Sequence, residues 1–202
     1  MNTGSSSEYG RQNVPRQEDL RLEPNTPDGV AKACQTLYGQ YLAREHGYPI
    51  VTLRLFSVYG PYEEPTRMVP TLITRALAGL PLKLADPATA RDFVYVADVV
   101  AAYGHAAVTP NLGGRIINVG TGRQTPMREL VAHILRLTQS SSPLAWRAYP
   151  PRTFDTDHWV CDNAQYQASL APTRMHDIEA GLRQTVEWMR DNPDHYHAEG
   201  DS

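Results

Sequence analysis

Residues 50–56 read Ile-Val-Thr-Leu-Arg-Leu-Phe, a short apolar run rich in β-branched side chains, and this composition predicts a buried strand. Before it, Thr26-Pro27-Asp28 predicts the start of a helix, because a capping Thr, a Pro at the first helical position and an acid in the first turn all favour one. Gly47 predicts its end. A helix that leads into a buried strand is the second half of a βαβ unit, whose first strand we expect near residues 1–5. The apolar residues at helical spacing are Val30, Cys34, Leu37, Tyr41 and Leu42.

Beyond residue 60 the same alternation of helices and strands continues. It predicts an α/β fold, with a partial doubly wound parallel sheet followed by a smaller α/β lobe. We place the sheet remnant at residues 1–60, the lobe at 61–192 and a disordered tail at 193–202. The expected helices are 69–77, 98–108, 127–137 and 178–190, and the expected strands are 82–84, 93–96 and 115–119.

Composition excludes several classes of protein. The 202 residues suit one domain of moderate size or a small pair of domains. No apolar run approaches the roughly 20 residues of a membrane span, residues 1–10 lack the pattern of a signal peptide, and a net charge of −3 gives no footprint for nucleic acid. Cys34 and Cys161 cannot form a disulfide framework, so we expect a cytoplasmic protein and place Cys34 in the core.

Several segments occur in an order that is typical of one family. They are residues 4–10 (GSSSEYG), 54–61 (RLFSVYGP), 91–98 (RDFVYVAD) and 118–122 (NVGTG), followed by a C-terminal match over 162–188. Together they resemble the extended short-chain dehydrogenases that act as NAD-dependent nucleotide-sugar epimerases and dehydratases. The resemblance covers the C-terminal part of that fold and implies that the lobe binds the substrate.

The resemblance also implies a catalytic set with one replacement. Its serine corresponds to Ser5 and its lysine to Lys32, but the position of its tyrosine holds Asp28. In the family the tyrosine exchanges a proton with a sugar hydroxyl during hydride transfer, whereas an ionised carboxylate is a weak base for an alcohol at neutral pH. Ser5, Asp28 and Lys32 are therefore candidates for a non-redox proton transfer. The alternative is an ordinary helix-start acid with a lysine four residues later.

The coenzyme site of the family has no counterpart that we recognise in this sequence. Its members begin with a strand, a glycine-rich turn and a helix that receives the pyrophosphate of NAD, whereas this sequence begins just before the serine motif. Gly120-Thr121-Gly122 follows a strand, but it lacks the third glycine and the later acid of a dinucleotide fingerprint. We therefore expect no NAD site in this chain. The seven histidines show no metal-ligand spacing, so we expect no metal site.

Two arginines are candidates for substrate binding. The resemblance implies that Arg91 and Arg152 hold a diphosphate, for which a guanidinium fork is well suited. Ser57 occupies a position where many relatives carry an Asn that contacts the sugar nucleotide. The alternative is that both arginines lie at the surface and pair with Asp92 or Asp155.

The function that we expect is that of a truncated epimerase/dehydratase homologue, not competent for NAD redox chemistry alone. It would bind a sugar-like or anionic intermediate and catalyse a cofactor-independent elimination, isomerisation or cyclisation. The alternative is a non-catalytic partner or a degenerate remnant of a full-length relative. Helix 27–45 is apolar over much of its circumference, which predicts a homodimer or a hetero-complex with such a relative. We expect neither a nucleic-acid nor a membrane partner.

Overall fold

A three-stranded parallel sheet forms one half of the molecule. The computed structural model describes residues 1–150, 156–170 and 175–196. Strands β1 (Asn2–Ser5), β2 (Thr52–Leu55) and β7 (Ile116–Val119) lie in the order β1-β2-β7. The crossover between β1 and β2 is α1 (Pro27–His46), so the expected βαβ unit and its first strand are confirmed.

The ends of α1 are formed by the residues that the sequence indicated. The Thr26 side chain accepts a hydrogen bond from the Gly29 amide at 3.1 Å, and Pro27 occupies the first helical position. Gly47 ends the helix in the left-handed conformation, with φ of 67°, which glycine adopts without steric cost. Both boundaries arise from local backbone chemistry.

The two faces of the sheet differ in chemistry. Leu53 and Ile117 are fully buried on the face that is covered by α3 (Val96–Val108) and α5 (Ala164–Leu170). On the opposite face, Arg54 lies beside Asn118 in the register of β2 and β7, and both are buried. This second face lies under α1, and polar side chains are buried there.

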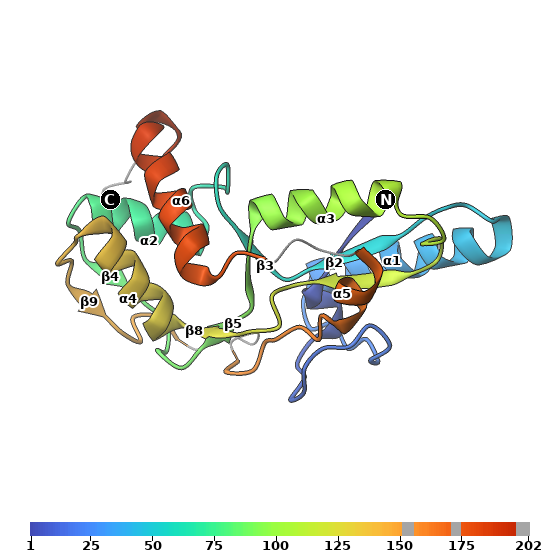
Figure 1. Cartoon of the computed structure of the whole chain (residues 1–202). Helices are drawn as coiled ribbons and strands as arrows, with labels where there is room; N and C mark the ends of the chain where they lie inside the picture. Colours follow the sequence, from blue (N-terminus) through green and yellow to red (C-terminus); the bar gives the residue numbers. More distant parts are fainter. Residues whose placement is uncertain (151–155, 171–174, 197–202) are drawn as a thin grey trace.

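A second region holds the apolar core of the smaller lobe. Helices α2 (Met68–Leu77), α4 (Met127–Thr138) and α6 (Ile178–Asp191) gather at the left of Figure 1, away from the sheet strands. Their buried side chains include Ile73, Ile134 and Leu182.

The α/β fold that was expected is therefore confirmed. The short elements are β3 (Ser57–Tyr59) paired with β6 (Phe93–Tyr95), β4 (Leu82–Lys83) with β9 (Leu144–Ala145), β5 (Ala90–Arg91) with β8 (Thr125–Pro126), and the 3-10 turns η1 (Ser6–Tyr9) and η2 (Pro193–His195).

Most of the large apolar side chains of α1 are exposed in the described part of the chain. Cys34 is exposed, so its predicted place in the core is wrong. Small residues face the protein interior instead, and a Cβ atom on Gly39 would lie 3.3 Å from Ile50 Cγ2. The close approach of helix and sheet requires these small residues, and the larger apolar side chains are left outside. The buried residues are Gly29, Ala33, Thr36 and Gly39; the exposed apolar ones include Val30, Leu37, Tyr38 and Tyr41.

The start of the segment expected as a tail contains a short 3-10 turn. Residues 193–195 form η2, and Tyr196 is 7% exposed and donates a hydrogen bond to the Glu63 carbonyl oxygen at 2.9 Å. The structure thus gives residues 193–196 a short turn and a buried contact, and residues 197–202 lie outside the described residues. Among the described helices, none is both long and apolar enough to cross a membrane.

Candidate functional site

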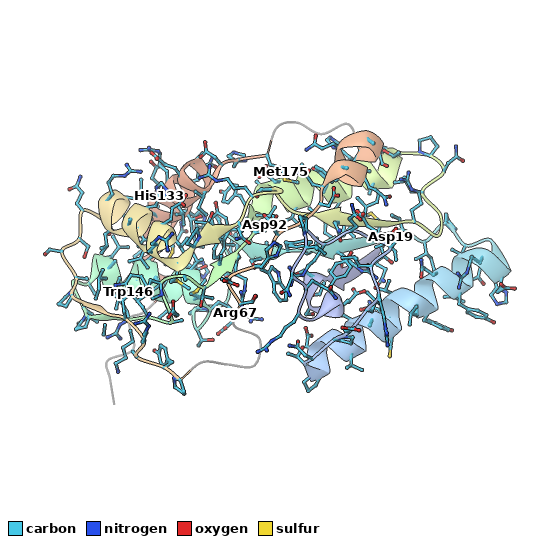
Figure 2. All side chains as sticks on the ribbon, turned by 90° about the horizontal axis from the view of Figure 1, so that it is seen from below. Asp19, Arg67, Asp92, His133, Trp146 and Met175 are labelled. Carbon is cyan, nitrogen blue, oxygen red and sulfur yellow. The ribbon has the colours of Figure 1, made fainter. Side chains whose placement is uncertain are left out.

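A cleft of about 1040 Å³ opens between the sheet and the smaller lobe. It is lined by Ser5 at the end of β1, by Ser57 just after β2 and by residues of the lobe that include Arg67. Ligands of open parallel sheets bind outside the carboxyl ends of the strands, and this cleft has that position. Figure 2 shows Asp92 near the middle of the molecule, with His133 and Trp146 on the side of the smaller lobe.

A hydrogen-bonded chain of serines leads across one wall of the cleft. Ser5 Oγ accepts from the Ser7 amide at 3.1 Å and from Ser7 Oγ at 2.8 Å. Ser7 Oγ also lies 3.5 Å from Asp28 Oδ2 at the start of α1. All three residues line the cleft, so Ser5 and Asp28 are brought together through a serine that sequence reasoning did not single out.

Lys32 does not join this group. Its Nζ donates to the Thr3 carbonyl oxygen at 3.0 Å and lies 3.5 Å from Gln35 Oε1. Lys32 is not among the residues that line the cleft. Two of the three residues predicted as catalytic therefore meet at the cleft, and Asp28 is exposed there.

The buried ion pair of Glu8 and Arg54 holds the turn that contains the serines. Glu8 is fully buried and accepts hydrogen bonds from the Ser5 amide at 2.8 Å, Thr36 Oγ1 at 3.0 Å and Arg54 Nε at 2.8 Å. A Cβ atom on Gly4 would lie 2.6 Å from Glu8 Oε1, so only glycine leaves room for this carboxylate. The turn that carries Ser5 is thus held by a satisfied carboxylate.

The predicted substrate-binding residues have different outcomes. Arg91 and Ser57 both line the cleft. Arg91 Nη1 donates to the Ala90 carbonyl oxygen at 2.8 Å, and the Ser57 amide donates to the Asp92 carbonyl oxygen at 3.0 Å. Arg152 lies outside the described residues. The cleft also contains two cations that were not predicted to bind substrate, Arg67 and Lys83.

The turn Gly120-Thr121-Gly122 does not fit a dinucleotide phosphate. Its Thr121 and Gly122 amides donate to the Asp92 carboxylate at 2.9 and 3.0 Å, and a Cβ atom on Gly120 would lie 2.8 Å from Cys161 Cβ. Burial raises the pKa of Asp92, and the hydrogen bonds that its carboxylate accepts act against this rise. The amides that could bind a phosphate therefore bind a carboxylate of the protein itself. Within the described ranges, no group of three or more His, Cys, Asp or Glu residues is placed to hold a metal ion.

Glu63 is a cleft residue that sequence reasoning missed. Its Oε2 atom is buried and has no hydrogen-bond partner among the described residues. Burial raises its pKa to about 7, and the nearby charge of Arg67 acts in the opposite direction. A carboxyl group with a pKa near neutrality can both hold and release a proton. An acidic pair after a Gly-Pro turn reads as a surface feature in sequence, so no local signal distinguishes Glu63.

Comparisons with known proteins point to one family. Residues 1–120 match the model of the NAD dependent epimerase/dehydratase family. A dTDP-glucose 4,6-dehydratase of Neisseria meningitidis is 28% identical over 186 residues, which cover 87% of this chain and 52% of that protein. A trifunctional UDP-glucose 4,6-dehydratase/3,5-epimerase/reductase of Arabidopsis thaliana is 27% identical over 182 residues, covering 90% of this chain and 27% of that protein.

Solved structures show the same similarity. MoeE5 in complex with UDP-glucuronic acid and NAD superposes with a TM-score of 0.87 at 30% identity, covering 94% of this chain and 64% of that one. UDP-glucose 4-epimerase of Thermotoga maritima, solved with UDP-glucose, has a TM-score of 0.85 at 28% identity, covering 95% and 63%. The chain thus spans about half the length of the bacterial dehydratase that it matches. Because the family model matches more than half of its residues, the chain belongs to the NAD-dependent epimerase/dehydratase family.

Proposed function

We propose that the cleft binds a nucleoside-diphosphate sugar or a similarly anionic sugar-like intermediate. The observation that carries this proposal is the convergence of Arg67, Lys83 and Arg91 on the cleft that also contains Ser5 and Asp28. Guanidinium and ammonium groups suit the diphosphate, and hydroxyl and carboxylate groups suit the sugar. The names of similar proteins, which act on UDP-linked and dTDP-linked sugars, support the same class of ligand.

We further propose an acid/base reaction that uses this chain's own side chains. The substrate of this step is a keto-sugar, in which a carbonyl group acidifies the neighbouring C–H. The exposed carboxylate of Asp28 removes that proton, the electron pair of the C–H bond forms the new C=C bond, and Ser5 and Ser7 hold the substrate hydroxyl beside it. Glu63 in its acid form delivers a proton to the leaving hydroxyl, which departs as water. Together these two transfers amount to an elimination, and return of the proton to another carbon would be an isomerisation. The support is the pKa of about 7 of Glu63 together with the Ser5–Ser7–Asp28 contacts.

The same proposal holds that residues 1–202 do not bind NAD by themselves. The support is that the Gly120–Gly122 amides are engaged by Asp92 and that Lys32 is engaged by the Thr3 carbonyl oxygen. Calorimetric titration of the chain with NAD, and separately with NADP, should show no binding heat at millimolar coenzyme. A dissociation constant in the low micromolar range would contradict this part of the proposal.

Titration with UDP-glucose tests the cleft. Arg91→Gln should weaken binding at least about tenfold, because the amide keeps a polar group but loses the charge and the second donor of the fork. Arg44→Gln, a change at an exposed arginine near the end of α1, is the matched control and should bind like the wild type. Equal affinity of Arg91→Gln and wild type for UDP-glucose would contradict the proposal that the diphosphate binds in this cleft.

Two substitutions test the chemistry once turnover is observed with a nucleotide sugar. Asp28→Asn should abolish turnover while the fold remains intact, because the amide cannot accept the proton. Asp19→Asn, at another exposed aspartate, should retain activity. Full activity in Asp28→Asn would leave Asp28 with only its role at the start of the helix.

The exposed apolar strip of α1 suits both candidate functions: an acid/base enzyme that is a homodimer, and the second candidate, a non-catalytic partner in a hetero-complex. Leu37 is 55% and Tyr38 63% exposed, and the rings of Tyr38 and Tyr41 stack with centroids 6.0 Å apart. We propose that this strip pairs with a second copy about a two-fold axis and buries roughly 1,200–2,000 Å² in total. Light scattering at micromolar concentration should give about twice 22.5 kDa, and a monomer mass alone would contradict self-association. A hetero-complex with a full-length relative is the competing outcome.

A further inference from the structure

Two arginines share the ring of a single tryptophan beside the cleft. The Cζ atom of Arg16 lies 4.0 Å from the centroid of the Trp159 ring, and that of Arg91 lies 4.9 Å from it. A cation over an indole is attracted by the negative face of the ring, and Trp is the strongest of the aromatic side chains in this respect. Both guanidinium groups are therefore attracted to one surface that is not itself charged.

The indole is fixed in place from several sides. Trp159 is 8% exposed, and its Nε1 donates to Ser6 Oγ at 3.2 Å. Its backbone amide donates to Gln124 Oε1 at 3.0 Å, and Phe56 and Cys161 belong to the same buried cluster. The ring is thus a rigid platform on the wall of the cleft.

Arg16 supports the platform from inside the protein. It is fully buried, and its guanidinium donates to the carbonyl oxygens of Gly10 at 3.1 Å and His158 at 3.3 Å. Within the described residues it forms no ion pair, and a buried cation without a counter-ion is costly. Contact with the Trp159 face offsets part of that cost, so Arg16 and the indole stabilise each other.

Of the two arginines, Arg91 is the one that lines the cleft together with Trp159. Its Nη1 atom donates to the Ala90 carbonyl oxygen at 2.8 Å and lies 3.5 Å from the Thr156 carbonyl oxygen. We propose that Trp159 is a positioning residue, which holds the Arg91 guanidinium ready for an anionic group of the ligand. This inference rests on the proposed function, in which Arg91 binds a diphosphate.

The advantage for binding is that the Arg91 side chain is already held in one conformation before the ligand arrives. An arginine side chain that is mobile before binding loses rotamer entropy when it binds, and a side chain that is already held loses less. Trp159 also contacts Ser6 in the serine turn, between Ser5 and Ser7. The same indole therefore sets the spacing between the anion-binding arginine and the serines that face the sugar.

NMR relaxation of arginine side chains tests the inference in the ligand-free protein. The Nε–H group of Arg91 should be ordered in the wild type, in contrast to the exposed Arg44. Trp159→Leu should reduce the order of Arg91 towards that of Arg44, whereas Trp146→Leu, the loss of an indole in the smaller lobe, should leave it unchanged. An Arg91 as mobile as Arg44 in the wild type, or unchanged order in Trp159→Leu, would overturn the proposal.

A double-mutant cycle with UDP as the probe adds a readout that a general loss of stability would not reproduce. Trp159→Leu should weaken UDP binding by about threefold to tenfold, and should have no further effect in the Arg91→Gln background. Unchanged UDP binding in Trp159→Leu would also count against the proposal. Additive losses would show that Trp159 does not act through Arg91. If the wild type does not bind UDP, the proposed function fails, while the relaxation experiment still decides the positioning role.

A second variant covers the case in which Trp159→Leu does not fold. Trp159→Phe keeps a ring but loses the N–H donor to Ser6 and offers arginine a weaker face. The order of Arg91 should fall part of the way in this variant, and thermal unfolding should confirm that it is folded. Order equal to the wild type would count against the proposal.

Discussion

The region under α1 and the region between α2, α4 and α6 are stabilised by different interactions. Under α1 the interior contains charges: Arg54 Nε bonds to Glu8 at 2.8 Å, and Arg54 Nη1 bonds to the Tyr9 hydroxyl at 2.9 Å. That hydroxyl donates to Asn118 Oδ1 at 2.8 Å, and burial raises the pKa of Tyr9 to about 12. The other region is filled by apolar side chains such as Ile134, which is fully buried.

The helices of these regions differ in the same way. Helix α4 buries its apolar stripe, whereas α1 buries small residues and exposes Leu37 and Tyr38. Both sequences show apolar residues at helical spacing. Periodicity thus indicates which side chains share one face of a helix, and the rest of the structure decides which face is covered.

The largest effect is expected where a buried charge loses its partner. Arg54→Met leaves Glu8 buried without its cation, and the free energy of unfolding should fall by about 3–5 kcal/mol. Urea denaturation checks this value, with exposed Arg44→Met as the control. A loss below about 1 kcal/mol would mean that the ion pair does not stabilise the α1 region.

In the apolar region the corresponding test is a cavity. Ile134→Ala in α4 removes a fully buried side chain, and stability should fall by about 2–5 kcal/mol. The control is Gln139→Ala at the C-terminal end of α4, because Gln139 is exposed. Its neighbour Thr138 is buried and would not serve. A change of less than about 1 kcal/mol for Ile134→Ala would contradict the apolar account of this region.

Between the two regions, the buried carboxyl group of Glu63 in the cleft should make stability depend on pH. The native state keeps the proton of Glu63 up to a pKa of about 7, whereas an unperturbed glutamate releases it near 4.5. Between these values the native state binds more protons than the unfolded state, so this stabilisation is complete below pH 4.5 and is lost as the pH rises through 7. The advantage of wild type over Glu63→Gln should therefore fall by about 2–3 kcal/mol from pH 4.5 to 8.

Thermal or urea unfolding at several pH values measures that difference. Glu64→Gln, at the exposed neighbour, provides the matched control and should show no such fall. A constant difference between wild type and Glu63→Gln would mean that Glu63 titrates at the same pH in both states.

The smallest effect is expected on the exposed strip of α1. Leu37→Ala should change the stability of the monomer by less than about 0.5 kcal/mol, because the side chain is 55% exposed. If the strip pairs two copies, the loss should grow with protein concentration, since association stabilises the folded state. Unfolding midpoints at two concentrations measure this, and a large loss at the lower concentration would show that Leu37 packs within its own chain.

Much of the fold could be predicted, because its signals are local. The Thr26 cap, the left-handed Gly47 and the apolar run of β2 each act through neighbouring backbone groups. The exposure of Cys34 could not be predicted, since it depends on how closely α1 approaches the sheet. The burial of Tyr196 depends in the same way on a contact with the loop at Glu63, more than a hundred residues earlier.

The residues of the candidate site also fall into those that motifs predicted and those that depend on tertiary contacts. Ser5, Ser57 and Arg91 were found from ordered motifs, and all of them line the cleft. Glu63 and Trp159 were missed, because neither residue lies in a motif and both obtain their properties from burial and from partners distant in sequence. Lys32 matched a motif, yet its side chain turns to the Thr3 carbonyl oxygen.

The sequence by itself determined the βαβ unit, the ends of α1, the α/β class and the family. It could do so because capping and periodicity arise between residues close in sequence, and the order of the motifs can be followed directly along the chain. Only the tertiary structure decided which face of α1 is covered, which carboxyl group is buried in the cleft, and which aromatic ring carries two arginines. The physical reason is that burial, the pKa of Glu63 and the cation–π contacts arise between groups that only folding brings together.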